Sequence, residues 1–358
     1  AYEYSSGGTV QYRQLGRTDL QVSQVGFGVW TVATGWWGHL EERDAVRLLQ
    51  DACHKGVTFF DTADTYGLGA GEEVLAKALG DHRHEIVVGT KFGYDWYTQR
   101  ERTDHKERPQ KWEPEFIRYA CEQSLKRLGT DYIDVYQLHN PRIDTIRQDE
   151  VFDLLDDLVK EGKIRFYSAA LGPDIGWLAE GKAAMKERSI VSLQIIYSIL
   201  EQQPARLFFH TAEEQNIGLL ARVPHASETL TEEFSKAPPV FDAEDHRSHR
   251  RREWLQLAIK KVERMRFLTQ HHPILLDQLA IAFCLAQPSV SSVLPNITSQ
   301  EKLRMYTAAV ESETPCEECL DQLYHHYDTY FGLEPAAIEW RTSQGVQKVD
   351  PSGNPYSL

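Results

Sequence analysis

Short apolar runs alternate with helical patterns along most of the chain, from Leu20 to Val310. Each run is five to seven residues long and rich in Val, Ile, Leu and aromatic residues, which is typical of buried strands. We expect eight strands, at Val22–Phe27, Val57–Asp61, Ile86–Lys91, Tyr132–Leu138, Ile164–Ala169, Val191–Ile195, Ile217–Arg222 and Val290–Leu294.

Between these runs, apolar residues recur at i, i+3, i+4 and i+7, as within residues 45–52, which predicts amphipathic helices. Seven of the eight strands are followed by such a segment. This alternation predicts an α/β chain folded as a (β/α)8 TIM barrel. A doubly wound sheet with a second domain is the alternative, but Gly26 and Gly28 lack the third glycine that would open a helix.

The chain divides into four expected segments. Residues 1–10 and 341–358 are rich in Gly, Ser and Pro and are predicted to be flexible tails. Residues 11–312 form the barrel, and residues 313–340 form a C-terminal helical extension. The turn at 15–20 predicts a small N-terminal hairpin that covers the floor of the barrel.

Composition narrows the class of protein further. The 358 residues are 41% hydrophobic and 26% charged, as in ordinary globular chains. The formal net charge of −14 disfavours binding to nucleic acid or to an anionic membrane. No apolar run approaches the ~18 residues of a membrane span, and no signal peptide is evident, so we expect a cytoplasmic protein. The composition is compatible with a homo-oligomer as well as with a monomer.

Five cysteines, an odd number, also indicate a reducing compartment. Cys316 and Cys319 form a lone CxxC motif near the C-terminus. A metal site would need two further ligands at suitable spacing, and none is present nearby. We therefore expect two reduced thiols and no metal.

Four ionisable residues fall at or just after the predicted ends of strands two to four: Asp61, Tyr66, Lys91 and His139. In a barrel, catalytic groups lie at these carboxyl ends. Taken singly, they have ordinary explanations as a helix cap, rim packing, surface charge and a core hydrogen bond. Taken together, they supply a phenol, an ammonium that lowers a phenol's pKa, a carboxylate that fixes the ammonium, and a hydrogen bond for a carbonyl oxygen.

These residues stand in specific motifs, in order: GFGVW (26–30), FFDTADTYG (59–67), GTKFG (89–93), LGTDYIDVYQLHNP (128–141), EGKIR (161–165) and LPN (294–296). From about Tyr12 to Ala309 the chain resembles the aldo-keto reductase superfamily. The resemblance implies a (β/α)8 barrel with Tyr66 as proton donor, supported by Asp61, Lys91 and His139. It also implies NADP(H) or NAD(H) as the cofactor.

For the cofactor, the resemblance implies binding by Gln194, Arg222, Pro224, Asn296, Thr298, Ser299 and Lys302. Lys302 aligns with a residue that often contacts a 2′-phosphate, which favours NADP, with NAD as the alternative. Arg222 replaces the usual aromatic that stacks on nicotinamide, and a guanidinium plane can also stack. A Ser-Asn pair after strand five is replaced by Ala170-Leu171.

The loop that commonly contacts the diphosphate departs most from the family. Its usual glycines and lysine are replaced within residues 224–233, which contain Glu228, Glu232 and Glu233. Carboxylates repel a diphosphate. We therefore expect this loop to point away from the cofactor or not to clamp it.

Aromatic and polar residues predict the substrate pocket: Trp30, Trp37, Tyr94, Trp96 and Asn140. Such a wall suits an aldehyde, a ketone or a sugar, or the corresponding alcohol in the oxidative direction. The alternatives are a nucleotide-binding regulatory subunit, as in potassium-channel β-subunits that resemble reductases, and an aldose dehydrogenase. A Schiff-base isomerase or lyase is disfavoured because Asp61 is placed to pair with Lys91.

Overall fold

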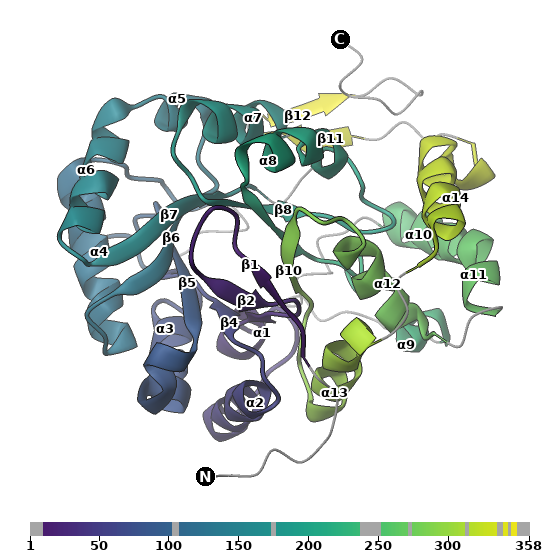
Figure 1. The fold of residues 1–358 in the computed structure, drawn as a ribbon, viewed down its shortest axis with the longest axis horizontal. Coiled ribbons are helices and arrows are strands. Elements are labelled where there is room, and N and C mark those ends of the chain that lie inside the picture. The colour runs from purple at the N-terminus through teal and green to yellow at the C-terminus, as the bar shows by residue number, and fades with distance from the viewer. Residues whose placement is uncertain are drawn as a thin grey trace.

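The predicted barrel is confirmed in a computed structural model, which describes residues 10–101, 107–172, 177–236, 252–270, 274–311, 315–334, 339–342 and 345–348. Eight parallel strands lie in sequence order around the centre (Figure 1). They are β3 (Phe27–Gly28), β4 (Phe59–Asp61), β5 (Val87–Phe92), β6 (Ile133–His139), β7 (Ile164–Ala170), β8 (Ser192–Ile196), β9 (Gly218–Arg222) and β10 (Val290–Leu294). Backbone bonds from Gly26 to Val293 and from Val293 to Gln24, both 2.8 Å, close the ring.

The first predicted strand, Val22–Phe27, is in fact divided between two elements. Its start belongs to β2 (Gln21–Ser23), which pairs antiparallel with β1 (Tyr12–Gln14) in an N-terminal hairpin. The Ser23 hydroxyl donates to the carbonyl of Val25 (2.7 Å), and the chain turns here into the barrel. The hairpin and its turn bury Leu15, Leu20 and Val22 against barrel-lining residues such as Phe59, Val87 and Val135.

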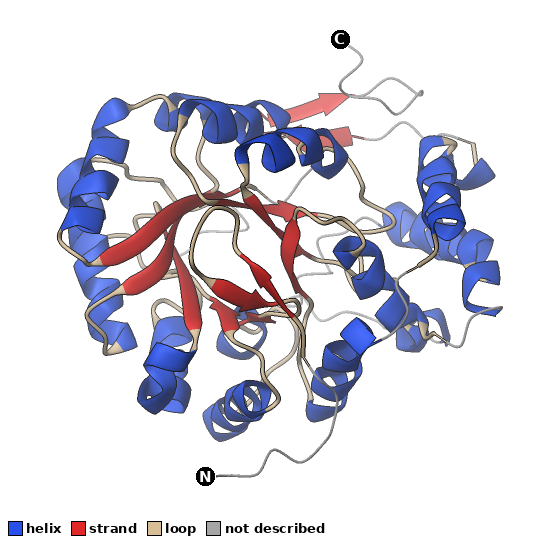
Figure 2. Ribbon diagram, in the orientation of Figure 1, coloured by secondary structure: helices blue, strands red, loops and turns tan. Residues whose placement is uncertain are grey.

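Helices surround the strands (Figure 2). The larger ones next to the barrel are α2 (Glu42–His54), α3 (Ala70–Leu79), α4 (Pro114–Leu128), α6 (Asp149–Lys160), α7 (Leu178–Glu187), α8 (Phe209–Gln215), α12 (Leu276–Leu285) and α13 (Gln300–Ala308). Short helices are α1 (Trp30–Ala33), α5 (Ile143–Ile146) and α9 (Glu232–Lys236). Each long helix turns an apolar stripe inward, as Ala45, Leu48, Leu49 and Ala52 do in α2.

Three helices lie to one side of the barrel: α10 (Arg252–Met265), α11 (Phe267–Gln270) and α14 (Glu317–Asp328) (Figure 1). The rings of Phe267 and His326 are 5.8 Å apart, so the segment after β9 packs against the C-terminal extension. The Arg206 guanidinium is 2.7 Å from Asp328 and anchors α14 to the barrel.

The limits of the four segments remain predictions. Residues 1–9 and 349–358 lie outside the described part of the chain. Where a tail was expected, the structure has a hairpin of β11 (Glu339–Thr342) and β12 (Gly345–Lys348). Its alternating sequence is short and flanked by Gly, Ser and Pro, which hid it from composition alone.

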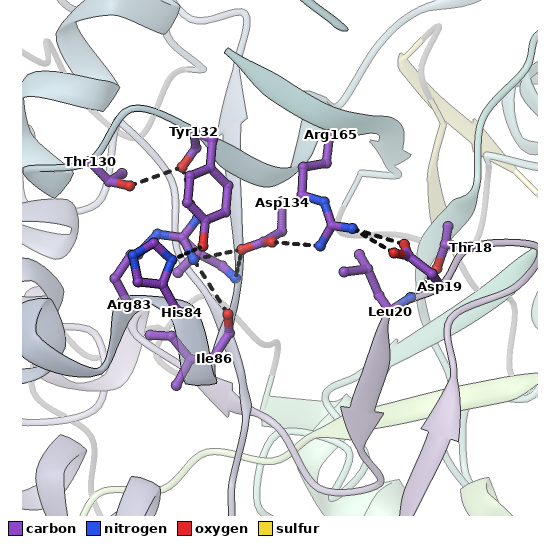
Figure 3. Close-up of polar contacts among 11 residues, drawn as sticks. Thr18, Asp19, Leu20, Arg83, His84, Ile86, Thr130, Tyr132, Asp134 and Arg165 are labelled. Carbon is purple, nitrogen blue, oxygen red and sulfur yellow. Dashed lines mark hydrogen bonds and ion pairs between the residues drawn. The ribbon is translucent and has the colours of Figure 1, made fainter. Parts of the chain in front are cut away.

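A row of charged residues forms ion pairs across the floor of the barrel (Figure 3). Asp134 in β6 is 2% exposed, and its carboxylate lies 2.8 Å from Arg83 and 3.6 Å from Arg165. The backbone N–H of Val88 also donates to it (2.9 Å). Arg165 continues to Asp19 in the hairpin turn at 2.8 Å, so the row joins the hairpin to β5, β6 and β7.

Asp134→Asn is expected to lower the free energy of unfolding by about 2 kcal/mol, because it leaves the buried Arg83 without its carboxylate. Asp19→Asn is the matched control, since Asp19 is exposed and its ion pair is screened by water. We expect it to cost less than about 0.5 kcal/mol. Urea unfolding of both variants measures the difference, and equal losses would contradict the buried role of Asp134.

Candidate active site

Four ionisable side chains meet at the carboxyl ends of β4, β5 and β6. Asp61 ends β4, and Tyr66 lies in the loop that follows it. Lys91 lies near the end of β5, and His139 ends β6. Asp61 and Lys91 are 0% and 1% exposed, and Tyr66 is also buried. The fold thus brings together the four residues that the sequence predicted to act as a unit.

The Lys91 ammonium is the centre of this cluster. It donates to Asp61 Oδ2 (2.5 Å), to the carbonyl oxygen of Thr62 (2.9 Å) and to the phenol oxygen of Tyr66 (3.0 Å). Burial by itself lowers the pKa of Lys91, but the charges and hydrogen bonds of Asp61 and Tyr66 outweigh it, so the pKa is raised. The side chain therefore holds its positive charge directly against the phenol oxygen.

The second oxygen of Asp61 accepts from two amides. Gln137 Nε2 is 2.7 Å and Gln194 Nε2 is 3.0 Å from Asp61 Oδ1. Sequence reasoning missed Gln137, although its position two residues before His139 on a strand places both on the inner face. Gln194, expected to hold the cofactor, here bonds to Asp61 and to Gln137 Oε1 (3.2 Å). The amides of Gln137 and Gln194 hold the Asp61 carboxylate in place, and this carboxylate in turn positions the Lys91 ammonium.

The His139 ring lies between two tyrosines. Its centroid is 6.1 Å from that of Tyr66 and 4.9 Å from that of Tyr94. Burial, and then the positive charges of Lys91 and Arg222, hold the pKa of His139 well below its ordinary value. Its Nδ1 has no hydrogen-bond partner among the described residues. The imidazole is therefore neutral at neutral pH and carries one nitrogen that is not engaged by the surrounding protein.

Three of the five predicted pocket residues lie at the cluster: Trp30, Tyr94 and Asn140. The Trp30 and Tyr66 rings meet edge to face at 6.1 Å. Tyr94 packs on His139, and its hydroxyl accepts a hydrogen bond from Asn140 Nδ2 (2.6 Å). Asn140 has a φ of +53°, a conformation that asparagine tolerates better than most residues.

The other two predicted pocket residues are placed differently. Trp96 stacks on Tyr97 at 4.3 Å and faces the Arg127 guanidinium at 5.2 Å, and neither of these partners belongs to the cluster. Trp37 is half-buried and packs against the apolar cluster that contains Tyr66. The neighbouring Trp36 meets the Tyr66 ring at 5.9 Å.

Beside this wall, Glu107 accepts from the Tyr94 hydroxyl (2.5 Å) and from Arg142 Nη1 (2.7 Å). Sequence reasoning missed this carboxylate, because Glu107 lies in a long loop and is distant along the sequence from the end of β5. A cavity of about 320 Å³ lies here, lined by Glu107, Arg108, Gln110, Trp112, Arg142, Asp144 and Thr145. Gln110 Nε2 donates to the carbonyl of His139 (2.9 Å), which connects this cavity to the cluster.

The residues expected to bind the cofactor lie at the ends of β9 and β10. Arg222 ends β9 and donates to the carbonyl of Leu171 (3.0 Å). Pro224 is buried in the following turn, and Thr298 is half-buried before α13. Ser299 caps α13, because its hydroxyl accepts from the backbone N–H of Lys302 (3.1 Å).

The acidic loop after β9 reaches this region through Glu228, and the expectation that the loop does not clamp the cofactor stays a prediction. Glu228 is buried, and its carboxylate accepts from Asn296 Nδ2 (2.9 Å) and from Lys302 Nζ (3.4 Å). Trp30 Nε1 in turn donates to Asn296 Oδ1 (2.8 Å). Glu232 faces Arg266 at 3.5 Å, and Glu233 is exposed. A carboxylate therefore occupies part of the site assigned to an anionic cofactor.

Other expectations concern metals and membranes. Over the residues that the structure describes, no cluster of three or more His, Cys, Asp and Glu is suited to a metal ion. Cys316 Sγ and Cys319 Sγ are 2.7 Å apart at the start of α14. Within the same part of the chain, no helix has the length and apolar character needed to cross a bilayer.

The sequence model of the aldo/keto reductase family matches residues 24–321. The chain belongs to the aldo/keto reductase family. An uncharacterized oxidoreductase of Bacillus subtilis (strain 168), YqkF, is 30% identical over 319 residues, which cover 88% of this chain and 95% of that protein. The NADH-specific methylglyoxal reductase of Escherichia coli (strain K12) is 27% identical, over 83% of this chain and 92% of its own length.

Among solved structures, the holo form of an aldo-keto reductase from Bacillus halodurans superposes with a TM-score of 0.70. It is 29% identical, and the match covers 88% of this chain and 96% of that structure. This aldo/keto reductase is accordingly an NAD(P)-dependent oxidoreductase of carbonyl compounds.

Proposed function

We propose that this aldo/keto reductase transfers hydride between a nicotinamide dinucleotide and the carbonyl carbon of an aldehyde, ketone or sugar, with Tyr66 as the proton donor. One observation carries the proposal: the Lys91 ammonium touches both Asp61 and the Tyr66 hydroxyl inside a buried cluster. A charged lysine in this position stabilises the negative charge that develops on the phenol oxygen as its proton leaves.

The donors at the ends of β9 and β10 fit a dinucleotide. Arg222 supplies a guanidinium, Lys302 an ammonium, Asn296 an amide, and the first turn of α13 after Ser299 supplies backbone N–H groups. When bound, the nicotinamide supplies or takes up the hydride. Gln194 Nε2 donates to Asp61 and Gln137, so the Oε1 of Gln194 is the atom that would accept from the nicotinamide carboxamide. The choice between NADP(H) and NAD(H) depends on Lys302 and on the carboxylate that faces it.

In the reducing direction, the protein moves one proton. The Tyr66 hydroxyl gives its proton to the carbonyl oxygen, and the Lys91 ammonium compensates the charge left on the phenol oxygen. The neutral His139 orients the carbonyl by a hydrogen bond from a ring nitrogen. Asp61 takes no proton; with its two amide donors it keeps Lys91 in place.

The wall of the pocket favours a small carbonyl compound with a polar substituent. Trp30 and Tyr94 supply apolar faces, while Asn140 supplies a polar group beside them. A 2-oxoaldehyde of the kind named for the Escherichia coli relative has this character. Trp37 packs against the apolar cluster that contains Tyr66 and is assigned to the outer part of the pocket, whereas the place of Trp96 in the pocket stays a prediction.

The first test is a tryptophan-fluorescence titration with NADPH and with NADH, followed by turnover assays on methylglyoxal, simple aldehydes and aldoses. Saturable binding with turnover of an aldehyde supports the proposal. Binding without turnover of any compound in the panel would instead favour the regulatory-subunit alternative. Turnover only of a sugar alcohol or aldose with the oxidised cofactor would assign the enzyme to the oxidative direction.

The pH dependence of kcat is expected to lack an inflection near pH 6.5. His139 stays neutral through that range, because burial, Lys91 and Arg222 hold its pKa well below the ordinary value. Its protonation, with loss of the neutral ring, falls at a lower pH. The measurement is kcat at saturating substrate from pH 5.5 to 8, for the wild type and for His139→Gln. An inflection near 6.5 that is present in the wild type and absent in the variant would contradict the assignment.

A further inference from the structure

The turn after β9 has an unusual backbone. The consecutive residues Ala226, Ser227 and Glu228 have φ values of +48°, +58° and +68°, and none of them is glycine. All three are buried. Side chains disfavour this left-handed conformation, so three in succession require that surrounding contacts hold the turn.

This turn buries the carboxylate of Glu228. Glu228 is 3% exposed, and its two oxygens face Asn296 Nδ2 and Lys302 Nζ. Asn296 is itself held by the Trp30 indole, which packs on Tyr66. An amide, an ammonium and the first turn of a helix are the donors that a phosphate group uses. Glu228 therefore places a negative charge of the protein where the amide of Asn296 and the ammonium of Lys302 converge.

We propose that Glu228 determines which dinucleotide the enzyme accepts, by selecting NAD(H) over NADP(H). The inference rests on the proposed function, namely that the Asn296–Lys302 segment holds the adenosine end of the cofactor. It replaces the preference for NADP that Lys302 alone suggested, because the positive charge of Lys302 is already matched by the Glu228 carboxylate.

The selection follows from charge and hydrogen bonding. NAD(H) carries a 2′-hydroxyl, which can donate a hydrogen bond to a carboxylate, as acidic residues do for this cofactor in other folds. NADP(H) carries a 2′-phosphate with a charge of about −1.5 to −2, by analogy with other phosphate monoesters. Beside Glu228, that phosphate meets a buried like charge and a lysine that is already paired.

The test compares the Kd values of NADH and NADPH, from tryptophan fluorescence, for the wild type and for Glu228→Gln. We expect the wild type to bind NADH more tightly. Glu228→Gln should lower the Kd of NADPH by about tenfold or more and change that of NADH by less than about threefold. Glu233→Gln is the matched control, because it removes the same charge from an exposed position five residues later. It should change neither Kd by more than about twofold.

Two further variants keep the test decisive. Glu228→Ser shortens the side chain and should give the same change of preference if Glu228→Gln does not fold. Adding Lys302→Met to Glu228→Gln should abolish the gain for NADPH. A wild type that prefers NADPH, or equal changes for both nucleotides in the Glu228 variants, would overturn the inference while leaving the proposed chemistry standing. Absence of binding of either nucleotide to every variant would overturn the proposed function, and the inference with it.

Discussion

Tyr66→Phe is expected to lower kcat for carbonyl reduction by ~100-fold or more and to change the Kd of the nucleotide by less than about threefold. The substitution removes only the hydroxyl, which lies 3.0 Å from Lys91 Nζ. The ring stays packed between Trp30 and Trp36, so the pocket keeps its shape. Without the hydroxyl, the carbonyl oxygen has no positioned proton donor as the hydride arrives.

Tyr136→Phe is the matched control for this experiment. Tyr136 is a fully buried tyrosine in the same barrel, and its hydroxyl has no hydrogen-bond partner among the described residues. Its removal should leave kcat unchanged. The measurements are steady-state kcat on an aldehyde and nucleotide Kd by fluorescence. Full activity of Tyr66→Phe, or equal losses in the two variants, would contradict the role of Tyr66 as the proton donor.

Much of the barrel was predictable from sequence because its strands are short, apolar and buried on both faces. Seven of the eight predicted strands overlap a single strand of the barrel, and the exception, Val22–Phe27, is divided between the hairpin and the barrel. Its apolar pattern runs through the division, because residues on both sides are buried. The apolar pattern indicates which residues are buried. It does not indicate the turn after β2, where the Ser23 hydroxyl donates to the carbonyl of Val25.

The reactive cluster was predictable for a related reason. Asp61, Lys91 and His139 lie at strand ends, and the barrel gathers those ends at one face. Contacts that depend on loop paths were not predictable in this way. Glu107 reaches Tyr94 from a loop, and Glu228 reaches Lys302 through residues whose left-handed backbone their own propensities disfavour. Only the assembled tertiary structure selects those conformations.

Lys91→Met is expected to abolish measurable turnover, with a loss of ~1000-fold or more, and also to lower the free energy of unfolding by about 3 kcal/mol. Both effects have one origin. Asp61 is 0% exposed, and without the ammonium its carboxylate keeps only the two amide donors of Gln137 and Gln194. A buried charge without its counter-charge is strongly destabilising, and the phenol oxygen of Tyr66 loses its electrostatic support as well.

The double variant Asp61→Asn with Lys91→Met separates these two effects. Asparagine retains an oxygen for the amides of Gln137 and Gln194 but carries no charge, so stability should return to within about 1 kcal/mol of the wild type. Activity should not return, because no cation faces Tyr66. Urea unfolding and kcat, measured on the two variants, test both statements.

Recovery of activity in the double variant would show that Lys91 has only a structural role. A double variant that is less stable than Lys91→Met would show that charge pairing does not stabilise the cluster. The expected result means that the buried pair is retained for the chemistry at Tyr66, since the fold can be held by neutral groups in its place.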